Sequence, residues 1–266
     1  MPADLDLLRR RLAELDRVIV AFSGGADSAF LAWVANDTLG PPRALAVTAV
    51  SPSLAGAERD DCRELAAEWG LRWREVVTVE MENAAYRAND GDRCFWCKDA
   101  LMDALTPLVA AEAAVVTLGV NVDDLGDHRP GQQAAAGRGA VFPLVEAGFA
   151  KADVREWSRR LGLRTWDKPA AACLASRLPY GTPVALGTLA QVEAAEAALK
   201  ALGFAELRVR HYRELARLEV PVEALARVVE RRDAVVAAVH AAGYRYVTLD
   251  LEGLRSGNLN AALGLP

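Results

Sequence analysis

Three of the four cysteines stand in a pattern that could do chemistry. Cys94 and Cys97 form a C-x-x-C pair in GDRCFWCKD, and Cys173 lies far from them in the sequence, in KPAAACLASR. A lone C-x-x-C can be a redox dithiol, half of a zinc site or part of an iron–sulfur site. Zinc usually takes four ligands and no second C-x-x-C is present, whereas three thiolates suit a [4Fe-4S] cluster with one open iron. The spacing favours a cluster, with a redox dithiol as the alternative.

A glycine-rich segment, SGGADS, is the second candidate site. It follows the apolar run Arg17–Phe22 and opens an apolar helical stretch. Gly24 and Gly25 allow a tight turn and the close approach of a ligand, Ser23 and Ser28 offer hydroxyl groups, and a helix start favours an anion. The segment matches neither G-x-x-x-x-G-K-[ST] nor G-x-G-x-x-G. It therefore predicts a polyphosphate site of another kind.

An acidic segment, LGVNVDDLGD, follows the fourth predicted strand. Asp123, Asp124 and Asp127 offer oxygen ligands to Mg²⁺, directly or through water, and Mg²⁺ would neutralise a pyrophosphate leaving group. With the strand order 3-2-1-4-5, this segment faces the glycine-rich loop across the switch point of the sheet. A solvated acidic loop is the alternative for each aspartate.

The elements that must position these residues alternate between strand and helix. Such alternation predicts βαβ units and a parallel sheet, with ligands at the carboxyl ends of its strands. We expect an α/β fold with a parallel five-stranded sheet of order 3-2-1-4-5 and helices on both faces. The predicted strands are Arg17–Phe22, Ala44–Val50, Arg72–Val79, Ala114–Val120 and Val141–Val145. The predicted helices run from the glycine-rich loop to Leu39, and over Asp60–Trp69, Phe95–Ala113 and Lys151–Leu161.

After Lys168 the pattern changes. The segment KPAAACLASRLPYGTP holds three prolines and no clear period, so we expect an ordered connector. The elements predicted beyond it are a helix over Leu186–Leu202, strands in LRVRHY and LARLEV, helices over Val222–Arg232 and Asp233–Ala242, and a strand over Tyr244–Leu251. The sequence thus predicts an α/β domain with the glycine-rich loop over 1–168, a cysteine-bearing connector over 169–185 and a small α+β domain over 186–266.

Composition excludes several classes of protein. The chain has 266 residues, 52% of them hydrophobic, and a net charge of −5, which excludes a disordered chain and a general basic field for nucleic acid. We expect no transmembrane helix, no secretory signal and no disulfide framework, and therefore a cytoplasmic protein. Cys62 shares one helical face with Leu65, Ala66 and Trp69, so we expect it in the core.

The string SGGADS resembles the SGG-x-DS signature of the PP-loop ATP pyrophosphatases. The resemblance implies that ATP is cleaved between its α and β phosphates, so that the substrate is adenylated and a nucleophile then displaces AMP. The residues assigned to ATP on this basis are Ser23, Gly24, Gly25, Asp27, Ser28, Gly119 and Asn121.

Longer segments resemble the LarE sulfur transferases. They are NVDD-x-x-D-x-RPG, FPLVEAGFAKADVREWSRRLGL, DKPAAACLASRLPYG, RVRHY with LARLEV, and DLEGLRSGNLN, which together span nearly the whole chain. The resemblance implies a role in making the nickel-pincer nucleotide of lactate racemase. ATP would adenylate a carboxylate of a pyridinium biscarboxylate mononucleotide, and sulfur would replace AMP to give a thiocarboxylate. It also implies a homo-oligomer, such as a hexamer, formed through the second domain.

Two sulfur sources are known in that family. In one branch the cysteine of A-x-x-C-L-A-S-R, here Cys173, gives up its own sulfur. In the other branch this cysteine and a C-x-x-C hold a [4Fe-4S] cluster with a labile sulfide. Because Cys94 and Cys97 accompany Cys173, the chain resembles the cluster branch; the sulfide donor is left open.

Basic residues are expected to complete the substrate site. Arg177, Arg208 and Arg210 are the candidates to bind the substrate phosphate, because arginine pairs two hydrogen bonds with phosphate oxygens. Arg208 and Arg210 alternate on a strand and so share one face. Ser176 is a weaker candidate, and Glu196 and Glu219 resemble family positions near the substrate or a metal.

Two other functions remain open on the sequence. A PP-loop enzyme that thiolates tRNA would use the same loop, although the acidic composition and the lack of an appended basic domain disfavour it. A zinc- or redox-cysteine protein with a vestigial ATP loop would use the same C-x-x-C. Metal content separates the zinc- or redox-cysteine protein from the LarE-like enzyme and from the tRNA-thiolating enzyme.

Overall fold

The computed structural model describes residues 3–126, 130–169 and 172–255. The chain divides into two compact units. The first consists of Met1–Glu80 and Cys94–Ala171, and the second of Met81–Arg93 and Ala172–Pro266. Residues 81–93 therefore group with the carboxyl-terminal part of the chain, although they lie between strands and helices of the first unit in sequence.

The first unit is built on a parallel sheet of four strands in the order β3-β2-β1-β4. The strands are β1 (Val18–Ala21), β2 (Ala44–Val50), β3 (Arg72–Val77) and β4 (Val115–Leu118). Val18, Ile19 and Val20 are all buried, as expected for a strand covered on both faces. The predicted α/β class and the order of the first four strands are confirmed.

The predicted fifth strand, Val141–Val145, is wrong, and the described sheet has four strands. Val141 makes only an isolated parallel bridge with Thr117. The short helix α7 (Pro143–Glu146) begins two residues later, with its proline in the first turn. Proline has no N–H to continue a strand ladder and is favoured at a helix start, so Pro143 converts the apolar run into a turn of helix.

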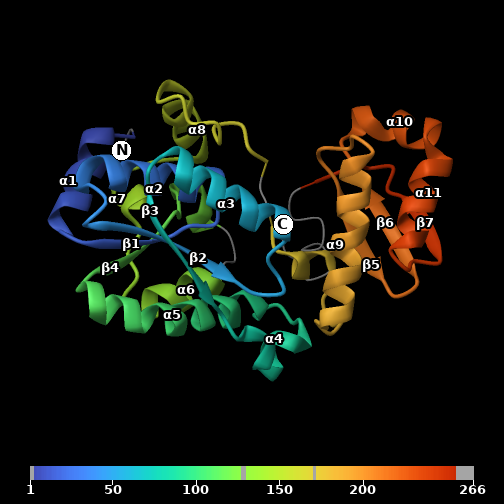
Figure 1. Ribbon diagram of the computed structural model, residues 1–266, viewed down its shortest axis with the longest axis horizontal. Helices are drawn as coiled ribbons and strands as arrows, with labels where there is room; N and C mark the ends of the chain where they lie inside the picture. The colour runs from blue at the N-terminus through green and yellow to red at the C-terminus, as the bar shows by residue number, and fades with distance from the viewer. Residues whose placement is uncertain (1–2, 127–129, 170–171, 256–266) are drawn as a thin grey trace. The chain divides into compact units, whose positions relative to one another are not determined.

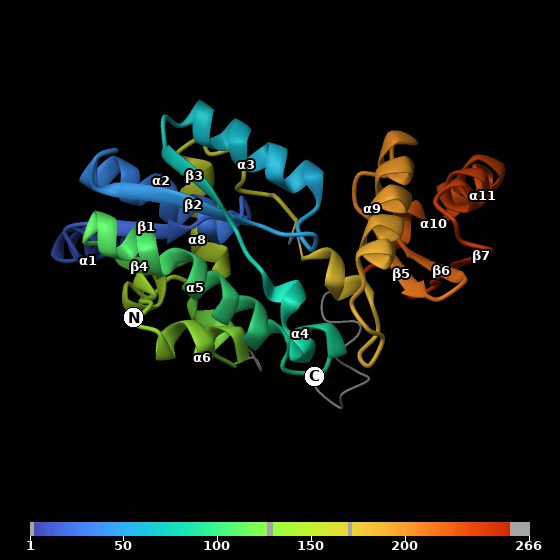
Figure 2. The ribbon, with the colours of Figure 1, turned by 60° about the horizontal axis from the view of Figure 1, so that its bottom comes forward.

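Helices cover both faces of this sheet (Figure 1). The cover on one face is α1 (Leu5–Glu14), α2 (Ala26–Leu39), α3 (Gly56–Glu68), α7 and α8 (Lys151–Arg160), and on the other α5 (Arg93–Glu112) and α6 (Pro130–Gly137). Figure 2 shows the same two layers from another side. Phe30 and Phe149 fill the first face and Leu45 and Leu105 the second. No helix in the described ranges is both long enough and apolar enough to cross a membrane.

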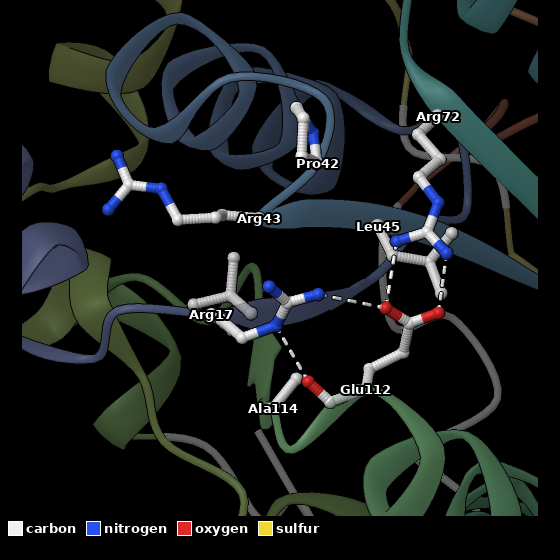
Figure 3. A pocket seen from close by; sticks show the side chains of 8 residues that line it. Arg17, Pro42, Arg43, Leu45, Arg72, Glu112 and Ala114 are labelled. Carbon is white, nitrogen blue, oxygen red and sulfur yellow. Dashed lines mark hydrogen bonds and ion pairs between the residues drawn. The ribbon is translucent and has the colours of Figure 1, made fainter.

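A charged cluster closes the amino-terminal edge of the sheet. Glu112, the last residue of α5, accepts hydrogen bonds from Arg72 at the start of β3 (2.8 and 2.5 Å) and from Arg17 before β1 (3.3 Å). Figure 3 shows these side chains and the hydrogen bonds between them. Because ligands of parallel sheets bind at the opposite, carboxyl edge, we interpret this cluster as a structural connection between β1, β3 and α5.

The second unit is built on a small sheet in the order β5-β6-β7. Strands β5 (Arg208–Tyr212) and β6 (Leu215–Glu219) are antiparallel, and β7 (Tyr246–Leu249) runs parallel to β6. The helices α9 (Leu186–Ala201) and α11 (Arg232–Ala241) pack on the sheet through Leu199, Val209 and Val239. The predicted helix Val222–Arg232 is replaced by a 3-10 turn, η4 (Val222–Ala224), and a shorter helix, α10 (Leu225–Glu230).

Four short elements remain among the described residues. Helix α4 (Ala84–Ala88) belongs to the second unit, as does the 3-10 turn η3 (Leu174–Arg177) that follows Cys173. Two further 3-10 turns, η1 (Glu80–Glu82) and η2 (Val122–Gly126), follow β3 and β4.

Candidate functional site

The glycine-rich loop joins β1 to α2 at the carboxyl edge of the sheet. Ser28 in the first turn of α2 closes the loop, because its hydroxyl donates to the Gly25 carbonyl (3.2 Å) and accepts from the Ser23 N–H (3.2 Å). The two serine hydroxyls also lie 3.0 Å apart. The loop is thus folded against the start of α2, where backbone N–H groups have no partner within the helix and favour an anion.

Two glycines permit this arrangement through close backbone approaches. Gly24 has a φ of +69°, and a Cβ there would lie 2.9 Å from the Cys62 sulfur. A Cβ on Gly119, just after β4, would lie 2.7 Å from the Ser28 nitrogen and 2.8 Å from the Asp27 carbonyl carbon. The end of β4 therefore lies directly against the first turn of α2, which places the loop beside the segment after β4.

The segment after β4 brings Asn121 and Asp124 to Asp27. Burial raises the pKa of the Asp27 carboxyl; a hydrogen bond with the Asn121 side chain opposes the rise, and the nearby charge of Asp124 adds to it. Asp27 Oδ1 is buried without a hydrogen-bond partner among the described residues. Lys151 and Arg155 of α8 also lie near enough to stabilise the carboxylate. Asp27 and Asp124 thus form an acidic pair with two cations close by.

Two of the three predicted magnesium ligands, Asp123 and Asp124, each accept a hydrogen bond from a backbone N–H. Asp123 Oδ2 accepts from the Lys151 N–H at the start of α8 (2.8 Å), and Asp124 Oδ2 accepts from the Asn121 N–H (3.1 Å). Asp127 lies outside the described residues. Over 3–126, 130–169 and 172–255, no group of three His, Cys, Asp or Glu side chains is arranged to hold a metal ion.

Lys168, the last residue of the predicted α/β domain, lies at this loop. Lys168 Nζ is 3.7 Å from the position that a Cβ on Gly24 would take, and it contacts Glu58 (2.8 Å) and Asp61 (2.5 Å) of α3. Burial opposes its charge, but hydrogen bonds with Asp61 and Glu58 outweigh burial and raise the pKa of Lys168. Lys168 lies in the segment DKPAAACLASRLPYG, but the sequence alone does not predict its contact with the loop, because its partners in α3 lie more than a hundred residues away.

The four cysteines differ in exposure. Cys62 is fully buried, and burial raises the pKa of its thiol to about 11, which confirms it as a core residue. Cys94 is exposed at the start of α5, and Cys97 and Cys173 are half-buried. No disulfide joins any of the four, all of which are described. Cys94 and Cys97 belong to the first unit and Cys173 to the second.

In the second unit, the predicted phosphate-binding arginines lie beside two buried carboxylates. Arg177 donates twice to Glu196 of α9 (2.8 and 3.0 Å), and Arg210 donates to Glu219 across the strand pair (2.9 Å). Ser176 donates through its hydroxyl to the Cys173 carbonyl (2.7 Å). Two of the three arginines are therefore already engaged by carboxylates.

Arg208 differs from these two arginines. Its Nη1 donates to the Arg255 carbonyl (3.3 Å), and no carboxylate in the described part of the chain forms an ion pair with it. Burial lowers the pKa of Arg208, and the neighbouring charges of Arg210 and Arg177 lower it further. An anion beside Arg208 would relieve this repulsion.

Comparison with protein-family models gives no match. The pyridinium-3,5-bisthiocarboxylic acid mononucleotide synthase of Lactiplantibacillus plantarum is 37% identical over 253 residues, which cover 95% of this chain and 92% of the synthase. The chain belongs to the LarE family. Other similar proteins are uncharacterised: one from Synechocystis is 45% identical over 266 residues, 99% of each chain, and one from Methanocaldococcus jannaschii is 24% identical over 241 residues, 90% of this chain and 91% of the other. The LarE similarity spans both units.

We expect Gly119→Ala to move the start of α2 away from β4, because the new Cβ would overlap backbone atoms that cannot rotate away. Overpacking of this kind lowers the free energy of unfolding by about 1–3 kcal/mol, and the displaced loop should bind ATP more weakly. Urea unfolding and ATP titration measure both effects. Gly137→Ala is the matched control, because Gly137 is exposed and a Cβ there meets no atom within 4 Å. Wild-type ATP binding by Gly119→Ala would contradict this placement of β4.

We expect Asp27→Asn to stabilise the protein at pH 7. Since burial raises the pKa of Asp27 in the folded protein, the unfolded chain ionises first as the pH rises, and stability falls between the two pKa values. The gain from Asp27→Asn should therefore vanish at a pH below the ordinary pKa of aspartate. Urea unfolding across pH checks this, with exposed Asp6→Asn as the control. A gain that is independent of pH would contradict the raised pKa.

Proposed function

We propose that this protein is an ATP-dependent sulfur transferase of nickel-pincer nucleotide biosynthesis. It adenylates a carboxylate of a pyridinium biscarboxylate mononucleotide and replaces AMP with sulfur, which gives a thiocarboxylate. The observation that carries the proposal is 37% identity, over 95% of the chain, to a synthase whose name describes a pyridinium mononucleotide with two thiocarboxylic acid groups.

The adenylation half of the reaction is assigned to the first unit. The substrate carboxylate attacks the α-phosphorus of ATP, the bond from that phosphorus to the bridging oxygen breaks, and pyrophosphate leaves. The start of α2 stabilises the leaving pyrophosphate through its N–H groups. Lys168 Nζ also lies beside Gly24 at this loop, where it is paired with Glu58 and Asp61.

Magnesium fits the acidic pair beside this loop. Asp27 Oδ1 is buried without a hydrogen-bond partner in the part of the chain that the structure describes, and Asp124 lies close enough to raise the pKa of Asp27. These two carboxylates would hold Mg²⁺ together with phosphate oxygens, with Asp123 and Asp127 as further candidates. The ion would neutralise charge on the leaving pyrophosphate. Asp123 and Asp124 each have one oxygen already bound by a backbone N–H, from Lys151 and Asn121 respectively, which leaves the other oxygen for the ion.

The sulfur-transfer half is assigned to the three cysteines of the two motifs. Cys94, Cys97 and Cys173 would hold a [4Fe-4S] cluster, which would supply a labile sulfide at its open iron. The donor set fits this group, since the three thiols form no disulfide and Cys94 is exposed. In the alternative branch the Cys173 sulfur itself replaces AMP, and the cysteine becomes dehydroalanine.

The substrate phosphate is assigned to Arg208, with Arg210 beside it. Arg208 forms no ion pair with a carboxylate among the described residues, whereas Arg210 Nη2 already lies 2.8 Å from Glu219 Oε2. Arg177 and Ser176, the other candidates, bind Glu196 and the backbone around Cys173. They would shape the site around the bound nucleotide.

The decisive experiment is anaerobic purification, with iron, sulfide and zinc quantified, followed by turnover with ATP and the biscarboxylate mononucleotide. We expect about four irons per chain, a thiocarboxylate and AMP in equal amounts, and loss of iron in Cys94→Ala. Intact mass after turnover reports the sulfur source, because a sacrificial Cys173 loses one H₂S. Stoichiometric zinc without thiocarboxylate would contradict the proposal, as would ATP-dependent thiolation of tRNA in place of the mononucleotide.

We expect Arg208→Ala to raise the KM for the mononucleotide about 10- to 100-fold, because hydrogen bonds to a charged group contribute about 1.5–3 kcal/mol. The KM for ATP should stay unchanged, since ATP is assigned to the first unit. Steady-state kinetics of both substrates measure this difference. Arg232→Ala is the control, because that side chain is 77% exposed. An unchanged KM for the mononucleotide in Arg208→Ala would place the phosphate elsewhere.

A further inference from the structure

The turn that carries Cys173 is held by side chains that bind its backbone carbonyls. A 3-10 turn as short as η3 satisfies few of its own carbonyl groups, and a buried carbonyl needs a partner. Three arginines supply such partners. Arg177 donates to the Ala172 carbonyl (2.5 Å), Arg93 to the Ala175 carbonyl (2.9 Å) and Arg210 to the Ser176 carbonyl (2.7 Å).

Asn89 extends this support to the chain after the turn. It is fully buried in a left-handed conformation, with a φ of 60°. Its amide donates to the carbonyls of Pro179 and Thr182 (2.9 Å each), and its Oδ1 accepts from Arg93. Asn89 and Arg93 thus form one hydrogen-bonded pair that binds the connector on both sides of Leu178.

This pair belongs to the segment 81–93, which comes from the middle of the chain and groups with the second unit. Backbone bonds reinforce the attachment: the Val184 N–H donates to the Arg87 carbonyl (2.8 Å), and the Gly181 N–H to the Asn89 carbonyl (3.1 Å). Arg93 is also the residue directly before Cys94. Arg93, whose side chain binds the Ala175 carbonyl two residues after Cys173, is therefore the residue immediately before the C-x-x-C pair.

We propose that Asn89 and Arg93 are positioning residues for sulfur transfer, which set the conformation of the Cys173 turn and attach it to the chain at Cys94. The inference rests on the proposed function, because it gives the pair a role in the chemistry of Cys173. Both side chains act through carbonyls of the connector, at Ala175 on one side of Leu178 and at Pro179 and Thr182 on the other.

The charge of Arg93 supports a positioning role. Arg93 is 6% exposed, and burying a guanidinium costs free energy that apolar packing would avoid. A guanidinium nevertheless binds several acceptors in one fixed plane, and Arg93 uses one nitrogen for both the Asn89 side chain and the Ala175 carbonyl. Such a group fixes a turn more sharply than packing does, because hydrogen bonds to charged donors are directional and strong.

The test compares Arg93→Ala, Arg93→Lys and Asn89→Gly with wild-type protein. Asn89→Gly keeps the left-handed backbone and removes only the amide. Arg87→Ala is the matched control, because Arg87 lies in the same segment, is exposed and donates to the carbonyls of Met81 and Glu82, outside the Cys173 turn. Three quantities are measured: the alkylation rate of Cys173 in folded protein, AMP formation and thiocarboxylate formation.

We expect Cys173 to be alkylated about tenfold faster in Arg93→Ala and Asn89→Gly, because a released turn exposes its thiol. The kcat for thiocarboxylate should fall about 100-fold, as expected when a reacting group is misplaced by about 1 Å, while the KM for ATP stays at the wild-type value. Arg93→Lys should lie between Arg93→Ala and wild type. Arg87→Ala should match wild type in all three quantities.

The result that would overturn the inference is wild-type alkylation and wild-type kcat in both Arg93→Ala and Asn89→Gly. A fall in kcat with an equal loss of ATP binding and of unfolding free energy would also overturn it, because that pattern indicates general destabilisation. If Arg93→Ala fails to fold, Arg93→Lys and Asn89→Gly carry the test. Failure of the proposed function is distinct, because wild-type protein itself would then form no thiocarboxylate, whereas the alkylation rates still report whether the pair holds the turn.

Discussion

The close approach of β4 to the first turn of α2 is the constraint on which the first unit depends. It is possible only because residue 119 is glycine, since a Cβ there would lie 2.7 Å from the Ser28 nitrogen. Through this approach the segment after β4 reaches the glycine-rich loop, and Asn121 and Asp124 reach Asp27. Two parts of the sequence about ninety residues apart thus become one site at the carboxyl edge of the sheet, where a parallel sheet binds its ligands.

Each of the two proposed subsites contains like charges that lie close together, carboxylates at the loop and arginines in the second unit. At the loop, Asp124 is close enough to disfavour ionisation of Asp27, and Lys151, Arg155 and Lys168 lie nearby. In the second unit, Arg177, Arg208 and Arg210 lie beside only two carboxylates, Glu196 and Glu219. The first arrangement suits a cation bound with phosphates, and the second suits an added anion, because each relieves a repulsion already present.

In the second unit, two arginines of the same strand motif, RVRHY, have different binding partners. Arg208 and Arg210 alternate on β5 and face the same side, yet Arg210 binds Glu219 and the Ser176 carbonyl, whereas Arg208 has no carboxylate partner in the described ranges. Position along the strand decides this difference. Arg210 lies closer to the Cys173 turn, so its guanidinium becomes part of the support of that turn.

The sequence by itself determined the family and the order of the first four strands, because its motifs resemble those of known families, and it determined the core position of Cys62 through local apolar periodicity. It failed at Val141–Val145, where Pro143 starts a helix. Only the tertiary structure showed the roles of Lys168, Asn89 and Arg93, and the grouping of residues 81–93 with the second unit. Their partners lie between about eighty and a hundred and ten residues away in the sequence. No local pattern encodes such contacts, because they form only when the chain has folded and buried groups must find hydrogen-bond partners.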